Sequence, residues 1–114
     1  MKSLKIPVHN IFKDIKCQKG VETFDLIAKK DFFKIEKTVS NGAKSPDGFW
    51  YDQPQDEFVL LLSGRAKISF EKGKRADLKR GDYILIPRRV KHRIEYTSSK
   101  PKCVWLCVFG KFCK

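Results

Sequence analysis

The sequence predicts an all-β domain, either a sandwich or a barrel. Its apolar and alternating segments are short, about five to seven residues each, which is the length typical of strands. Clusters of Gly, Pro, Asn and Asp separate them at near-regular intervals, as in "NGAKSPDG" and "KRGD". No segment has the length and periodicity of a long helix, and no internal repeat is present, so a helical bundle and an α/β fold are both disfavoured.

The length of 114 residues fits a single domain spanning residues 1–114. Apolar residues make up 41% and charged residues 33% of the chain, which is typical of a globular protein. No apolar run approaches the ~18 residues that a membrane helix needs. The stretch "MKSLKIPVHN" has neither an apolar signal core nor a small-residue cleavage site. We therefore expect a soluble, cytoplasmic protein with no membrane contact.

The predicted strands follow one another from residue 23 to residue 109. The first segment, 23–28, alternates like a strand, although Val21, Phe24 and Ala28 would also share a helical face. Residues 29–31 are expected to join it to the second strand. Residues 1–20 are irregular, with one helical turn capped by Asn10 as an option. The remaining predicted strands span 32–40, 57–62, 65–71, 83–87, 92–97 and 103–109.

Side-chain alternation predicts which residues face the interior. In the second strand Phe33, Ile35 and Val39 share one face, so Lys34 and Glu36 are expected to point away from the core. In the last strand Cys103, Trp105 and Cys107 share one face. The four cysteines, which also include Cys17 and Cys113, match neither CxxC nor a zinc-finger spacing, so packing is the favoured role and a soft-metal site or redox thiol pair the alternative.

Two spaced motifs carry the most specific information. Glu57 is followed by six residues and Gly64, within a stretch of about residues 48–64. Gly81 is followed by five residues, Pro87, four residues and His92, within about residues 81–96. In order and spacing this pair resembles the two motifs of the cupin superfamily. The resemblance implies a double-stranded β-helix, or jelly-roll, barrel with Glu57 and His92 both facing its interior.

A narrower resemblance is carried by "SPDGFWYDQ" and "DEFVLLLSG", which are similar to a group of small bacterial and archaeal cupins. It implies a fold and a pocket but no particular substrate. Metal-binding cupins place two histidines before the motif Glu. Here those positions hold Trp50 and Asp52, or Tyr51 and Gln53, depending on the alignment.

The resemblance therefore implies a reduced ligand set of Glu57 and His92, with Asp52 or Gln53 as a third ligand. A histidine with oxygen donors suits one divalent ion such as Zn, Fe, Mn or Ni. The alternative is a metal-free, buried ion pair between Glu57 and His92, which would also explain a carboxylate at the start of a buried strand.

Aromatic and basic residues near the motifs predict the nature of the ligand. Trp50 and Tyr51 are suited to wall a pocket for a planar or sugar-like molecule, and Phe49 adds a third ring. Arg88, Arg89 and Arg93 near the barrel mouth favour a small anionic ligand. The pocket residues expected are Trp50, Tyr51, Gln53, Arg93 and Tyr96.

Three functions are compatible with these features. The first is a non-catalytic binding or sensing module. The second is a metal-dependent enzyme of the oxygenase or isomerase type that uses Glu57 and His92 as ligands or as acid and base. The third is a nucleic-acid partner, suggested by the net charge of +12. Because the lysines are scattered and no nucleic-acid motif is present, we expect only weak, non-specific binding there.

The strand at 57–62 also predicts an assembly. If Glu57 faces inward, Val59 and Leu61 do too, and Phe58, Leu60 and Leu62 lie on the outer face. An apolar outer face should be covered. We expect a homodimer through this face, with coverage by the N-terminal segment as the alternative.

Overall fold

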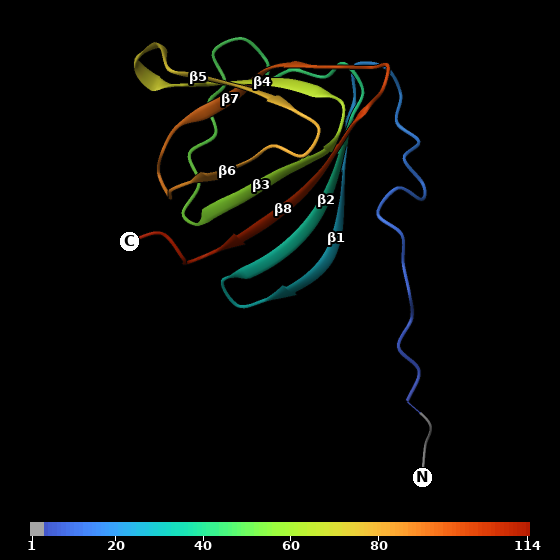
Figure 1. Ribbon diagram of the computed structural model, residues 1–114. Coiled ribbons are helices and arrows are strands. Elements are labelled where there is room, and N and C mark those ends of the chain that lie inside the picture. Colours follow the sequence, from blue (N-terminus) through green and yellow to red (C-terminus); the bar gives the residue numbers. More distant parts are fainter. Residues whose placement is uncertain (1–3) are drawn as a thin grey trace.

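Figure 1 shows the computed structural model of the chain, which describes residues 4–114. Within this range the chain forms two antiparallel sheets, one of five strands in the order β1-β2-β8-β3-β6 and one of three in the order β5-β4-β7. The strands are β1 Glu22–Lys30, β2 Phe33–Ser40, β3 Asp56–Ser63, β4 Arg65–Phe70, β5 Arg75–Lys79, β6 Tyr83–Ile86, β7 His92–Thr97 and β8 Cys103–Gly110.

The predicted all-β jelly roll is confirmed, and so is the choice of a strand rather than a helix for β1. The strand β5 was missed, because Arg75, Asp77 and Lys79 hide the alternation of Ala76 and Leu78. Asn10 begins a hydrogen-bonded turn, with Lys13 N donating to Asn10 O, and no helix forms there. A short 3-10 helix, Glu71–Gly73, joins β4 to β5.

Gly64 lets the chain pass from the five-stranded to the three-stranded sheet. Its φ of +90° lies in the left-handed region that favours glycine. A Cβ at this position would lie 2.7 Å from Cys103 Sγ and 2.9 Å from Cys103 Cα. Both the backbone conformation and the space therefore require glycine at the end of the first motif.

The hydrophobic core lies between the two sheets and is built from alternate residues of the central strands. On β3, Val59 and Leu61 are buried, as the position of Glu57 predicts. On β8 the predicted shared face is also confirmed, since Cys103, Trp105 and Cys107 are all buried in this core. The other buried members are Ala66, Ile68, Leu78, Ile86 and Phe109.

The predicted orientation of β2 is wrong. Lys34, Glu36 and Thr38 face the barrel interior, where they line a cavity. Ile35 and Val39 pair with Val108 and Val104 of β8 on the outer face of the sheet. The alternation was real, but the interior at this end of the barrel is a polar pocket, so apolar residues did not mark the inner face.

From residue 4 the chain starts away from the barrel and then rises to it before β1 begins (Figure 1). Lys37 Nζ donates to Lys13 O at 2.6 Å, and Lys102 Nζ donates to Ile15 O at 3.3 Å, so residues 13–15 are held against the body. By contrast Leu4, Ile6 and Val8 are at least three-quarters exposed.

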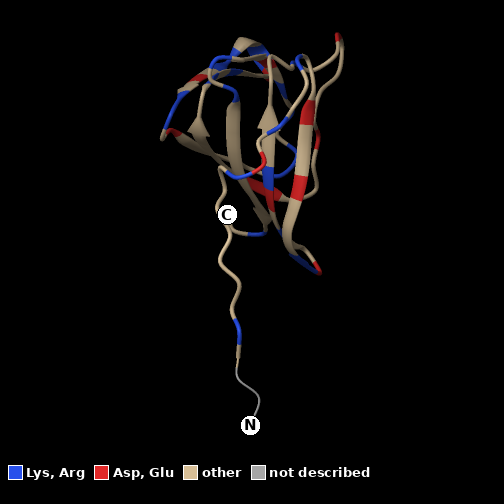
Figure 2. Ribbon diagram, turned by 90° about the vertical axis from the view of Figure 1, so that its right-hand side faces the viewer, with Lys and Arg blue, Asp and Glu red and all other residues tan. Residues whose placement is uncertain are grey.

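The charged residues are distributed widely. Figure 2 shows Lys and Arg on most parts of the ribbon, with no single stripe. In the part of the chain that the structure describes, no helix is long and apolar enough to cross a membrane.

Candidate functional site

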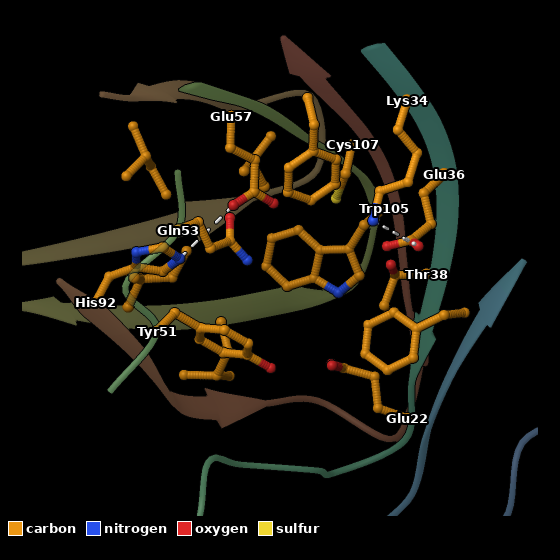
Figure 3. Close-up of a pocket in the computed structure, with 16 residues that line it drawn as sticks. Glu22, Lys34, Glu36, Thr38, Tyr51, Gln53, Glu57, His92, Trp105 and Cys107 are labelled. Atoms are coloured by element: carbon orange, nitrogen blue, oxygen red, sulfur yellow. Dashed lines mark ion pairs between the residues drawn. The ribbon is translucent and has the colours of Figure 1, made fainter. Parts of the chain in front are cut away.

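A pocket of about 250 Å³ opens at one end of the barrel. Strands of both sheets and the loop before β3 supply its wall (Figure 3). The wall combines carboxylates, aromatic rings, an imidazole, an amide and a thiol. The residues that line it are Glu22, Phe24, Lys34, Glu36, Thr38, Tyr51, Gln53, Glu57, Val59, Ile68, Ile86, His92, Ile94, Trp105, Cys107 and Phe109.

Glu57 and His92 meet in this pocket from opposite sheets. Glu57 is the second residue of β3 and His92 the first of β7, and they are 8% and 4% exposed. His92 Nε2 lies 3.6 Å from Glu57 Oε1, which confirms the geometry predicted from the motif spacing. That separation is longer than a hydrogen bond. Both groups therefore keep capacity to bind a third molecule between or beside them.

The His92 ring is held in place from three sides. Its Nδ1 lies 3.1 Å from the carbonyl oxygen of Val90, so this nitrogen is the donor and Nε2 faces Glu57. Tyr51 pairs with His92 through both backbone hydrogen bonds, and the two rings stack at 5.3 Å with a 22° interplanar angle. Phe70 packs on the ring at 6.2 Å. In the neutral form, Nε2 presents a lone pair to the pocket.

A second carboxylate, Glu22, is fixed by a hydrogen-bond relay. Trp105 Nε1 donates to Ser40 Oγ at 3.1 Å, and the Ser40 hydroxyl donates to Glu22 Oε2. Burial raises the pKa of the Glu22 carboxyl, the Ser40 hydrogen bond offsets part of this, and the charges of Glu36 and Glu57 raise it further. The carboxylates are therefore close enough to repel one another.

The third carboxylate, Glu36, has a cationic partner from its own strand. Lys34 Nζ lies 3.5 Å from Glu36 Oε2 and 4.4 Å from the centre of the Phe109 ring. Figure 3 shows this pair on the opposite side of Trp105 from His92. An ammonium group is thus already accommodated in the pocket by a carboxylate and an aromatic face.

The charges of the pocket carboxylates also raise the pKa of two neutral groups, the Tyr51 hydroxyl and the Cys107 thiol. Burial raises the pKa of the Tyr51 hydroxyl, and Glu22, Glu57 and Glu36 raise it further. Burial also raises the pKa of the Cys107 thiol well above its ordinary value, with Glu57 and Glu36 adding to the shift. Cys107 is therefore a protonated packing residue at the pocket floor, not a reactive thiolate.

Gln53 lies in the pocket with Tyr51, as the sequence predicted. Its side-chain oxygen is buried and accepts no hydrogen bond from any residue in the range 4–114. A buried acceptor without a partner is unfavourable unless a bound molecule or water supplies a donor.

The other predicted site residues lie outside this pocket. Asp52 is at the surface, where Arg89 Nη1 lies 3.4 Å from its Oδ1. Trp50 lines a separate shallow depression with Phe70 and Lys91, among others. Tyr96 is 46% exposed, with Lys67 Nζ 5.9 Å above its ring.

The arginines expected to attract an anion are occupied elsewhere. Arg88 pairs with the buried Asp56 at 3.4 Å, Arg89 with Asp52, and Arg93 with Glu95. Arg93 also donates to Ser45 O at 3.1 Å and lies over the Trp50 ring. Because none of these arginines lines the pocket, the reason for expecting an anionic ligand is not met in the structure.

The pocket does not fit the metal centre that the cupin motifs imply. No three His, Cys, Asp or Glu side chains within residues 4–114 are arranged to hold one metal ion. Glu57 and His92 converge, but Asp52 points to Arg89, and Gln53 could supply only a neutral amide oxygen. A divalent ion would have one imidazole, one carboxylate and a weak third donor.

The pocket residues that sequence reasoning missed come mainly from β1 and β2. Glu22, Lys34, Glu36 and Thr38 were outside both motifs, and a charged residue in an alternating strand normally faces solvent. The one available signal was the number of charges on both faces of the second strand, "FKIEKTVS".

Comparison with known proteins agrees with this architecture. The sequence profile of the cupin domain matches residues 37–109. The chain belongs to the cupin family.

Two solved structures superimpose well on this one. A protein from Ralstonia eutropha that is proposed to be a mannose-6-phosphate isomerase is 37% identical, with a TM-score of 0.86 over 93% of this chain and 100% of the other. A cupin superfamily protein from Desulfitobacterium hafniense is 18% identical, with a TM-score of 0.74 over 97% of this chain and 100% of the other. The comparison with curated proteins finds no match.

Proposed function

We propose that this cupin is a binding or sensing module that holds a small organic molecule in the barrel pocket without a metal ion. The observation that carries the proposal is the composition of the wall. It offers carboxylates and aromatic rings around a cavity of about 250 Å³, and no three-residue metal set lies within residues 4–114. Aromatic walls with a few placed polar groups are typical of ligand pockets.

The pocket also has the chemistry expected for a sugar-like molecule. Tyr51 and Trp105 offer apolar ring surface, and Gln53 and Glu57 offer acceptors for hydroxyl groups. The similarity to a proposed mannose-6-phosphate isomerase supports a carbohydrate ligand as well. The His92 ring and the Glu22 carboxylate are already held in position by their neighbours, so ligand binding requires no rearrangement of these two groups.

The indole signals of the two tryptophans test this proposal. In a ¹⁵N-labelled sample, a library of sugars, polyols and amines should shift the Trp105 indole resonance and leave that of Trp50 in place. Trp50 lies outside the pocket and so serves as an internal control, and a Trp50→Phe variant assigns the two signals. Native mass spectrometry of protein purified without a nickel column should show a co-purified small molecule. Ligands that bind only after a metal is added would contradict the proposal.

A second candidate is a proton-transfer enzyme of the isomerase type. It is favoured by the His92 tautomer, in which Nδ1 donates to Val90 and Nε2 faces Glu57. In such a reaction His92 would remove the proton from C2 of an aldose while a protonated Glu57 gives its proton to the C1 oxygen, which forms an enediol. Glu57 would then take the proton of the C2 hydroxyl, and His92 would return a proton to C1 to give the ketose. Mannose 6-phosphate incubated in D₂O should then gain deuterium at C2, and both His92→Gln and Glu57→Gln should abolish the exchange. If no deuterium is incorporated, the isomerase candidate is rejected and the binding module remains the proposed function.

A functional nucleic-acid partner is the weakest candidate. The basic residues do not gather in one stripe, and several are paired with carboxylates. We expect binding to DNA or RNA that disappears at about 0.15 M salt, because counterion release dominates such contacts.

A further inference from the structure

The pocket carries three carboxylates and one ammonium group, and its neutral donors are the Tyr51 and Thr38 hydroxyls and the Gln53 amide nitrogen. Three carboxylates, from Glu22, Glu36 and Glu57, share the wall with the buried Gln53 oxygen. When the imidazole is neutral, His92 Nε2 adds a lone pair, because Nδ1 then carries the proton that is donated to Val90. The formal cation that lines the pocket is Lys34, which is engaged by Glu36. A complementary ligand must supply donors and positive charge.

The spacing of the carboxylates suits an organic cation better than a metal ion. They do not converge on one point, since no three acidic, His or Cys side chains within residues 4–114 could hold a metal. Yet they are near enough that the charges of Glu36 and Glu57 act on Glu22. Carboxylates spread around a cavity can each meet a different face or end of a molecule of several heavy atoms.

Aromatic surface is present beside these acceptors. Tyr51 stacks on His92, and Trp105 is anchored through Ser40. Lys34 shows how an ammonium fits, since its Nζ lies against both the Phe109 ring and Glu36. Aromatic faces and carboxylates together are the surroundings that attract ammonium groups most strongly.

From these contacts we infer that the pocket recognises a small molecule bearing an ammonium group, such as an amino sugar or a short amine, and discriminates against phosphorylated molecules. This inference rests on the proposed binding function and specifies its ligand class. Glu57 and Gln53 accept hydrogen bonds from the ammonium beside His92. Lys34 is a resident cation that competes with the ligand for Glu36 and the Phe109 face.

Two matched sets of probes test the charge preference. The first set is glucose, glucosamine and glucose 6-phosphate, and the second is 1,4-butanediol and putrescine. Each is titrated against the ¹⁵N-labelled full chain while the Trp105 indole signal is followed. Within at least one set we expect the amine to bind about tenfold more tightly than its neutral counterpart, because hydrogen bonds to a charged group are about twice as strong. Glucose 6-phosphate should bind most weakly.

Substitution of Lys34 should change the affinity for cationic and for anionic ligands in opposite directions. Lys34→Met should tighten binding of the amine, because the competing ammonium is removed, whereas it would weaken binding of a phosphate. Lys67→Met is the matched control, since Lys67 also lies over an aromatic ring but outside the pocket. Glu57→Gln and Glu22→Gln should each remove most of the preference for the amine. Glu95→Gln, outside the pocket, should leave it unchanged.

The outcomes separate this inference from the proposed function. Equal binding of neutral and cationic members overturns the inference but leaves a binding pocket. Tighter binding of glucose 6-phosphate, or weaker amine binding in Lys34→Met, also overturns it. If no amine shifts the Trp105 indole resonance at tens of millimolar, the inference is wrong. The proposed binding function is then tested by native mass spectrometry, which should detect a co-purified small molecule.

Discussion

The carboxylates of Asp56 and Glu57 leave β3 on opposite sides, although the two residues are adjacent in the chain. Asp56 Oδ1 accepts a hydrogen bond from Arg88 N, and its Oδ2 accepts from both Phe112 N and Cys113 N, all at 2.8 Å. Glu57 faces the pocket. One carboxylate thus joins the start of β3 to two distant segments of the chain, and the other serves the site.

The first prediction concerns acid stability. The hydrogen bonds from Cys113, Phe112 and Arg88 lower the pKa of Asp56 to about 2, from an ordinary 3.8. Because the folded-state pKa is the lower one, Asp56 contributes its stability above about pH 4 and loses it as the pH falls toward 2. Asp56→Asn should therefore be less stable than the parent at pH 7, with a difference that vanishes near pH 2.

Urea unfolding at a series of pH values measures this difference. Asp77→Asn is the control, since Asp77 is exposed on β5. A stability difference for Asp56→Asn that stayed constant from pH 7 to pH 2 would show that the charge of Asp56 contributes nothing.

The second prediction compares the two motif glycines. Gly64 and Gly81 have nearly the same φ, +90° and +91°, but nothing lies within 4 Å of a Cβ built on Gly81. Gly81→Ala should lower the free energy of unfolding by roughly 1–2 kcal/mol through backbone strain alone. Gly64→Ala adds the overlap with Cys103, so we expect about 2–5 kcal/mol. Equal urea midpoints for the two variants would disprove the steric argument.

The third prediction concerns metal content. Because Glu57 and His92 are the only strong donors that converge within residues 4–114, elemental analysis of protein purified without a nickel column should find less than stoichiometric Zn, Fe, Mn or Ni. The opposite result, one ion per chain that is lost in His92→Ala, would support the metal-dependent enzyme. Asp52→Ala then reports on the third ligand, and we expect it to have no effect, because Asp52 pairs with Arg89.

The fold and the central pair of the site could be predicted because the two motifs resemble, in order and spacing, those of the cupin superfamily. In the structure Gly64 and Gly81 both have a φ in the left-handed region, and Glu57 and His92 lie 3.6 Å apart. The rest of the pocket could not be predicted in this way. Glu22 and Glu36 reach it through pairing of β1, β2 and β8, and such long-range pairing leaves no fixed spacing in the sequence.

The last prediction is the homodimer, which we propose forms through the outer face of the five-stranded sheet. Strand register places Leu85, Phe58, Val108 and Ile35 side by side on that face, across four strands. The next row contains Tyr83, Leu60, Leu106 and Lys37, and the Lys37 ammonium donates to Lys13 O. Tyr83 is 62% and Leu85 54% exposed in the single chain. Covering such side chains contributes about 1.5–3 kcal/mol each.

A second copy suits this face better than the N-terminal segment does. The hydrogen bonds from Lys37 of β2 and from Lys102, next to the start of β8, hold residues 13–15 several strands away from β6. Val39 of β2 and Val104 of β8 are buried, whereas Tyr83 and Leu85 of β6 stay exposed, as do Leu4, Ile6 and Val8. The row of Leu85, Phe58, Val108 and Ile35 contains no charged side chain, which is unusual for a chain of net charge +12. A two-fold axis would place this face against the same face of a second copy.

Light scattering at micromolar concentration should give twice the 13.3 kDa of one chain. Leu60→Lys should restore the single-chain mass with the fold intact. Val90→Lys, a comparable substitution in a loop away from this face, should remain dimeric. A parent protein of single-chain mass would reject the dimer.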